Sequence, residues 1–163
     1  MTSFLFTNGR VLDPEAGVTR RGLDVLVEEG RIKHVGERLD APSGAQRIDL
    51  AGRTLMPGLI DCHVHVVAET LDLWANIIAP TSLSALRSAR VMEEALQRGF
   101  TTLRDLGGAD IGLVRGVEEG LIKGPRLIIC GKGLTTTGGH ADLRQRTDDR
   151  PGMMSDRLGS MGY

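Results

Sequence analysis

The sequence predicts an α/β protein in which a small antiparallel β-sheet precedes a series of alternating strands and helices. Over residues 4–56, glycine turns separate short apolar strands at intervals of about ten residues. From residue 57 onward, apolar residues at helical spacing alternate with short apolar strands. The order strand, helix, strand, helix, strand is typical of βαβ units, whose strands lie parallel in one sheet. The chain has 163 residues, of which 40% are hydrophobic and 25% charged, and this composition is typical of a globular protein.

Three hairpins are predicted in the first part of the chain. Their turns are expected at Asn8-Gly9, Glu29-Gly30 and Ala51-Gly52. Asn-Gly is a strong two-residue hairpin signal, because both positions tolerate a positive φ. The paired strands would be residues 4–7 with 10–12, 23–28 with 31–35, and 46–50 with 53–56. We therefore expect an antiparallel sheet from this part.

The strand predicted at residues 59–66 carries two histidines, His63 and His65. Residues i and i+2 of an extended chain project from the same face, so both imidazoles are expected to point to one place. Zinc binds imidazole readily and usually has three or four protein ligands. The pair could therefore supply half of a metal site, with Asp61 on the same face to orient it. The alternative is a pair of hydrogen-bonded or solvated histidines without a ligand role.

Two helices and two further strands are predicted after this strand. The first helix begins at Pro80-Thr81-Ser82 and ends before Gly99, and the second is capped by Asp110 and ends near Gly124. The strands are expected at residues 101–106 and 126–130. The latter is a continuous apolar run, as in strands that are buried on both faces.

The order Pro57-Gly58, two apolar residues, Asp61, His63 and His65 resembles the first barrel strand of the amidohydrolase superfamily. Residues 99–107 resemble its second strand. Residues 124–127 and 135–142 resemble the third strand and its loop in the branch with Xaa-Pro dipeptidase-like and imidazolonepropionase-like enzymes. The resemblance implies that residues 1–56 form part of a small antiparallel β-sandwich. It also implies that residues 57–163 form the first three β/α units of an incomplete (β/α)8, TIM-like barrel, since a whole barrel needs about 250 residues.

The resemblance also implies the chemistry. Members hydrolyse C–N bonds of amides or peptide-like substrates with one or two divalent metals, most often Zn²⁺. It makes His63 and His65 metal ligands and places His140 near substrate. His140 could equally be a loop histidine satisfied by water. The remaining ligands and the acid/base group come from later strands, so no catalytic residue is assigned. Asp105 and Asp142 could orient histidines or arginines, or act as capping or surface residues.

Three functional hypotheses follow. In the first, the chain is the N-terminal part of a metal-dependent amidohydrolase and is inactive alone, because its ligand set is incomplete. In the second, another polypeptide or an unusual oligomer completes an active hydrolase. In the third, the chain is a non-catalytic α/β binding module derived from the hydrolase. Open strand edges predict association, including a possible homo-oligomer.

Composition argues against several other classes. A net charge of -1 gives no electrostatic case for nucleic acid or an anionic membrane, and neither a signal peptide nor a long apolar span is indicated. The two cysteines, Cys62 and Cys130, are isolated, as in a reduced cytoplasmic protein. The glycines near residue 131 lack the spacing of a nucleotide-binding loop. The resemblance implies a small amide or dipeptide-like molecule as the partner.

Overall fold

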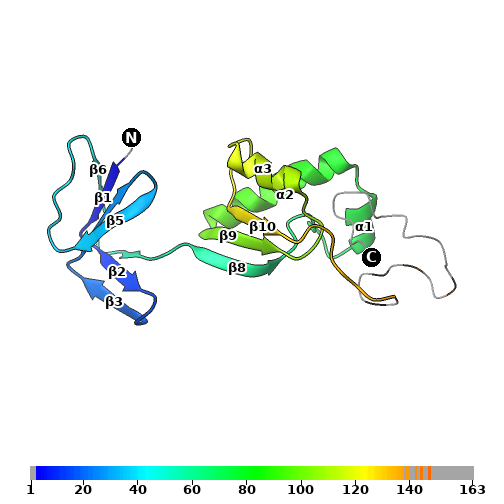
Figure 1. The fold of residues 1–163 in the computed structure, drawn as a ribbon, viewed down its shortest axis with the longest axis horizontal. Helices are drawn as coiled ribbons and strands as arrows, with labels where there is room; N and C mark the ends of the chain where they lie inside the picture. Colours follow the sequence, from blue (N-terminus) through cyan, green and yellow to red (C-terminus); the bar gives the residue numbers. More distant parts are fainter. Residues whose placement is uncertain (1–2, 138, 140–141, 143, 145–146, 148–163) are drawn as a thin grey trace. The chain divides into compact units, whose positions relative to one another are not determined.

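A computed structural model describes residues 3–137, 139, 142, 144 and 147 (Figure 1). The chain divides into two compact units, Met1–Pro57 and Gly58–Tyr163. That the first is part of a β-sandwich and the second the opening of a barrel stays a prediction. Within the described residues, no helix is long and apolar enough to cross a bilayer.

The first unit contains two β-sheets. One has the strand order β5-β4-β1-β6 and the other β3-β2-β7. Leu5, Val25 and Leu26, from the two central strands of the larger sheet, are its buried apolar residues. The seven strands are β1 Ser3–Thr7, β2 Arg10–Asp13, β3 Val18–Arg21, β4 Asp24–Glu28, β5 Arg31–Gly36, β6 Gln46–Asp49 and β7 Thr54–Leu55.

Only one of the three predicted hairpins forms. β4 and β5 pair antiparallel, as expected. β1 and β2 do not pair with each other, and neither do β6 and β7. Instead, β1 pairs parallel with β6, and β2 pairs parallel with β7. The prediction of a purely antiparallel sheet was therefore wrong, and each sheet of the first unit is mixed.

At Asn8-Gly9 and Ala51-Gly52 the chain passes from one sheet to the other instead of reversing. The two crossings run side by side, because Leu50 N–H donates to the Thr7 carbonyl and Arg10 N–H to the Arg53 carbonyl, both at 2.9 Å. Asn8 has the positive φ of 56° that the hairpin signal requires, and Ala51 has 48°. The residues at these turns were identified correctly, but a positive φ fits a crossing as well as a hairpin.

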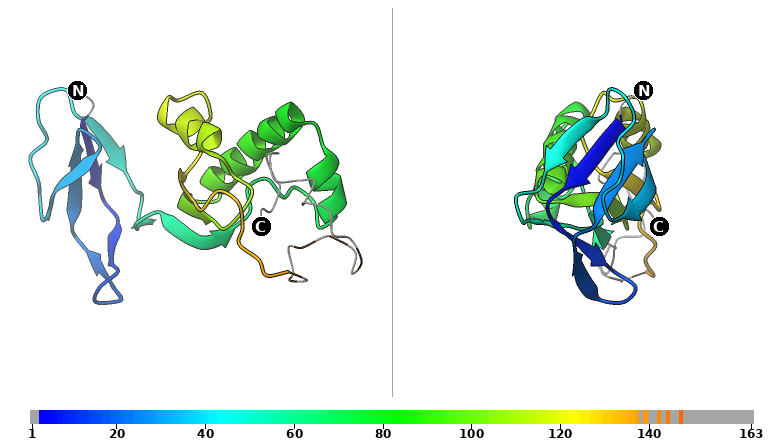
Figure 2. Two further views of the ribbon diagram at one scale, coloured as in Figure 1. Left: turned by 45° about the vertical axis from the view of Figure 1, so that its right-hand side comes forward. Right: turned by 90° about the vertical axis from the view of Figure 1, so that its left-hand side faces the viewer.

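The second unit contains a three-stranded parallel sheet of order β10-β9-β8. Helices α2 and α3 lie on the same side of this sheet (Figures 1 and 2). Met92 of α2, Leu103 of β9, Leu113 of α3 and Leu127 of β10 are buried in one core. The elements are β8 Leu59–Val64, α1 Leu73–Ile78, α2 Thr81–Gln97, β9 Phe100–Asp105, α3 Ile111–Glu118 and β10 Arg126–Ile129.

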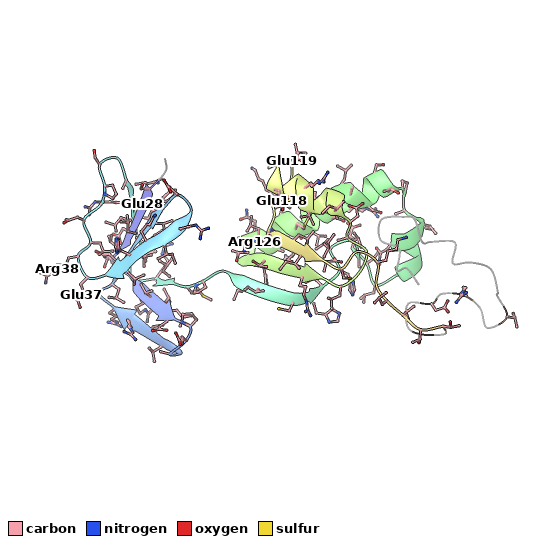
Figure 3. The ribbon with its side chains drawn as sticks, viewed as in Figure 1. Glu28, Glu37, Arg38, Glu118, Glu119 and Arg126 are labelled. Atoms are coloured by element: carbon pink, nitrogen blue, oxygen red, sulfur yellow. The ribbon has the colours of Figure 1, made fainter. Side chains whose placement is uncertain are left out.

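Asp110 caps α3 as predicted, and its side chain accepts hydrogen bonds from Gly112 N–H at 2.9 Å and Leu113 N–H at 3.3 Å. The helix ends earlier than expected, at Glu118. Glu118 and Glu119 are exposed there, on the surface of the unit (Figure 3).

Along α2, the buried residues are Ser84, Ser88 and Met92, whereas Leu86 is 71% exposed. The prediction that residues 126–130 are buried on both faces was wrong. β10 is buried on one face only, because Leu127 is buried but Ile128 is 51% exposed. Among the described residues, helices cover one face of this sheet. The face that carries Ile128 is open.

Candidate metal centre

The two histidines lie together at the C-terminal end of β8. His63 is the second-last residue of β8, and His65 comes directly after the last residue of the strand. Their ring centroids are 5.6 Å apart, and the ring planes meet at 76°. His63 is exposed and His65 is partly buried. The expectation that the two rings share one place is therefore met, while their role as ligands stays a prediction.

A β-bulge decides which face the histidines occupy. Asp61 pairs with Leu103 and Val64 with Asp105, so β8 advances three residues where β9 advances two. Directly paired residues project from the same face of a sheet, and a bulge re-aims the residues within it. Val64 packs against the buried core below the helices. His63 and His65 flank Val64, and because side chains alternate along an extended chain, we infer that both project to the opposite, open face.

The same bulge corrects the prediction for Asp61. Asp61 is on the face of Leu103, so it does not share a face with the histidines. Its carboxylate accepts a hydrogen bond from the backbone N–H of His63 at 3.0 Å, and it contacts neither ring by a hydrogen bond. Asp61 therefore fixes the backbone of the bulge. Cys62, between Asp61 and His63, is exposed.

His65 is held through one ring nitrogen. Its Nδ1 lies 3.0 Å from the carbonyl oxygen of Gly107. A carbonyl oxygen can only accept, so this hydrogen bond requires the proton on Nδ1. In a neutral imidazole the other nitrogen, Nε2, then carries a free lone pair, which is the form that ligates a metal.

Asp105 is a fully buried carboxylate beneath this arrangement. Its Oδ2 accepts from Val66 N–H at 2.7 Å. Its Oδ1 accepts from Gly107 N–H at 2.9 Å and Ala109 N–H at 3.4 Å. Sequence reasoning left Asp105 open, either as a residue that orients histidines or arginines or as a capping or surface residue. Its place at the end of a strand, directly before Leu106-Gly107-Gly108, was the only sequence signal that it would accept hydrogen bonds from the following turn.

The other predicted site residues are not brought to the histidines. His140 lies outside the described residues. Asp142 forms a two-pronged ion pair with Arg144, with both contacts at 2.9 Å. Among the described residues, no group of three or more histidine, cysteine, aspartate or glutamate side chains could hold a metal ion. The described part of the chain therefore contributes two imidazoles, which fit half of a tetrahedral site.

Comparison with known proteins gives the context for this pair. The sequence model of the amidohydrolase family matches residues 54–158. A solved prolidase complexed with N-methylphosphonate-L-proline is 43% identical, with a TM-score of 0.91, over 99% of this chain and 40% of its own. A Xaa-Pro dipeptidase with bound methionine is 25% identical, with a TM-score of 0.76, over 91% of this chain and 38% of its own.

Ochratoxinase from Aspergillus niger is 32% identical over 139 residues, which are 82% of this chain and 29% of that enzyme. This chain therefore spans less than half of the length of each of these relatives. Its structural neighbours are prolidase and Xaa-Pro dipeptidase-like amidohydrolases, as the sequence resemblance implied. Since the family's sequence model covers more than half of its residues, the chain belongs to the amidohydrolase family.

Proposed function

We propose that this chain supplies the first metal-ligating strand of a hydrolase that cleaves a C–N bond in a small amide or dipeptide-like substrate. The observation that carries the proposal is the pair of imidazoles at the end of β8, with ring centroids 5.6 Å apart on the open face of the sheet. The prolidase and the Xaa-Pro dipeptidase among its relatives support an Xaa-Pro type of substrate.

The surrounding fold is proposed to be the opening of a (β/α)8 barrel. β8, β9 and β10 lie side by side in chain order and parallel, with helices between them. In such barrels the active site lies at the C-terminal ends of the strands. His63, His65 and the Asp105–Gly107 segment all lie at that end of the sheet.

His63 and His65 would hold a divalent metal, with Zn²⁺ the first choice for imidazole ligands. When bound, such a metal would activate a water molecule and polarise the scissile carbonyl. The chain's own residues prepare the site. The Asp61 carboxylate fixes the backbone at His63, and the Gly107 carbonyl orients the ring of His65. No acid/base residue is assigned, and a cytoplasmic location stays a prediction.

Metal binding is the direct test. Zn²⁺ would be titrated into the full 163-residue chain by calorimetry, with His34→Ala as the matched control. His34 is an exposed histidine on β5, in the other unit. We expect weak binding, because two imidazoles leave the metal short of ligands. His63→Ala and His65→Ala should each weaken it by about tenfold or more, and His34→Ala should not. Unchanged binding by the double variant His63→Ala, His65→Ala would refute the proposal.

A second candidate is a non-catalytic binding module, favoured by the lack of a third ligand among the described residues. Turnover of an Xaa-Pro dipeptide separates the possibilities. We expect none from the chain alone, since two ligands do not hold water in a catalytic geometry. Turnover that a chelator abolishes would instead show that an assembly completes the site. A metal-free chain that unfolds cooperatively as a monomer and binds no Zn²⁺ would favour the binding module.

A further inference from the structure

We propose that Asp105 is a positioning residue that fixes the tautomer and the orientation of His65. The inference rests on the proposed metal site for its purpose, but its geometry does not require a metal. Asp105 touches neither histidine ring. It acts on His65 through two backbone segments that it holds at once.

The first segment is the chain directly after His65. Oδ2 of Asp105 accepts from the N–H of Val66 at 2.7 Å, and Val66 is 2% exposed. Leu106 N–H donates to the Val64 carbonyl at 3.0 Å, so the residues on both sides of His65 are attached to the end of β9. The Cα of His65 is therefore fixed relative to the loop after β9.

The second segment is the turn that faces the His65 ring. Oδ1 of Asp105 accepts from the N–H of Gly107, and the carbonyl of the same residue accepts from Nδ1 of His65. Gly107 and Gly108 have φ angles of 156° and 105°, a region that favours glycine. This conformation aims the Gly107 carbonyl at the ring, and the carboxylate holds it there.

The two oxygens of one carboxylate thus set both the position of the His65 backbone and the position of the acceptor for its ring. Asp105 is 0% exposed, so its three N–H partners replace water entirely. A buried carboxylate is costly unless its oxygens are bonded in this way. Because the acceptor is fixed, the proton stays on Nδ1 and Nε2 remains available as a ligand.

Asp105→Asn tests the role with little change in shape. An asparagine replaces one of the two carboxylate oxygens with an NH₂ donor, so an acceptor remains either for Val66 or for Gly107 and Ala109, but not for both segments. Asp110→Asn is the matched control. Asp110 also accepts two backbone N–H bonds after β9, but it caps α3 and does not contact His65 or Gly107. Asparagine is as good a helix cap as aspartate.

The first readout is the ¹⁵N spectrum of the metal-free full chain at a pH where imidazole is neutral. Wild type and Asp110→Asn should show His65 with its proton on Nδ1, whereas Asp105→Asn should show a mixture of tautomers. The second readout is Zn²⁺ affinity, which should fall about 10–100-fold in Asp105→Asn and stay unchanged in Asp110→Asn.

Several outcomes would overturn the inference. A wild-type His65 with its proton on Nε2 does so without any variant, even if Asp105→Asn fails to fold. Equal effects of Asp105→Asn and Asp110→Asn on the tautomer and on affinity would reduce Asp105 to a stabilising residue. If wild type has the Nδ1 tautomer but binds no Zn²⁺, the proposed metal site fails while the positioning role stands.

Discussion

At the scale of single residues, close approaches between β8 and β9 define the start of the second unit. Gly58 precedes β8, and the Leu59 N–H donates to the Gly99 carbonyl at 2.9 Å. A Cβ built at Gly58 would lie within 2.6 Å of the Thr101 Cβ and would collide with the rest of that side chain. Glycine is therefore required here by the neighbouring strand, in addition to any turn that Pro57-Gly58 forms.

Gly58→Ala should destabilise the chain by about 1–3 kcal/mol, the usual cost of overpacking. Chemical denaturation followed by circular dichroism measures the loss. In the Thr101→Gly variant, Gly58→Ala should cost less than it does in wild type, because the colliding side chain is absent. A Gly58→Ala chain as stable as wild type would contradict this account of the contact.

At the scale of elements, two connecting segments pass side by side between the sheets of the first unit. One leads from β1 to β2 and the other from β6 to β7. Asp49 lies between them, where it accepts from Ala51 N–H at 2.7 Å and from the Asn8 side chain at 2.8 Å. These two hydrogen bonds lower the pKa of Asp49 below its ordinary 3.8, and the Ala51 bond has the larger effect. The ionised carboxylate is thus a stabilising group at the crossing.

A lowered folded-state pKa gives a signed pH dependence. The stabilisation by Asp49 is present above the unfolded-state value and is lost as the pH falls through the folded-state value. The stability difference between wild type and Asp49→Asn should therefore shrink as the pH falls from about 5 to about 2. The effect should be modest and sensitive to salt, because the group is exposed. Urea midpoints at a series of pH values test it, and parallel profiles for the two chains would count against it.

The cap of α3 is a second prediction at this scale. Asp110 satisfies two backbone N–H groups at the start of a short helix. Asp110→Ala should cost about 1 kcal/mol, whereas Asp110→Asn should cost much less, because asparagine also accepts at this position. Denaturant midpoints of the two variants measure the difference. Equal losses would show that the negative charge, and not the hydrogen bonds, is what stabilises the helix start.

At the scale of the molecule, the second unit exposes both strand edges and apolar surface. β8 and β10 each pair on one side only, within the described strands. Ile60 of β8 is 64% exposed, and Ile128 of β10 is 51% exposed. Unpaired parallel edges with apolar side chains favour pairing with another chain.

The chain should therefore associate in a concentration-dependent way, which sedimentation velocity measures. A double variant, Ile60→Lys with Ile128→Lys, should shift the distribution toward monomer, because charges on strand edges oppose pairing. Leu121→Lys is the control, since Leu121 is 79% exposed but lies outside every strand. A monomeric wild-type boundary at all concentrations would contradict the prediction.

The sequence by itself determined the family, the alternation of strands and helices after residue 57, and the two histidines that lie together. Those features depend on local patterns: a hydrophobic period, a cap at Asp110, and the His63–His65 spacing.

Tertiary structure decided what local patterns cannot specify. A positive φ at Asn8 permits a hairpin or a crossing, and only pairing with β6 chose the crossing. Likewise, the bulge in β8 appears only when β9 is paired beside it, and it separates Asp61 from the histidines. The proposed role of Asp105 depends on Val66, 39 residues away in the sequence, because only folding brings the Val66 N–H to the carboxylate.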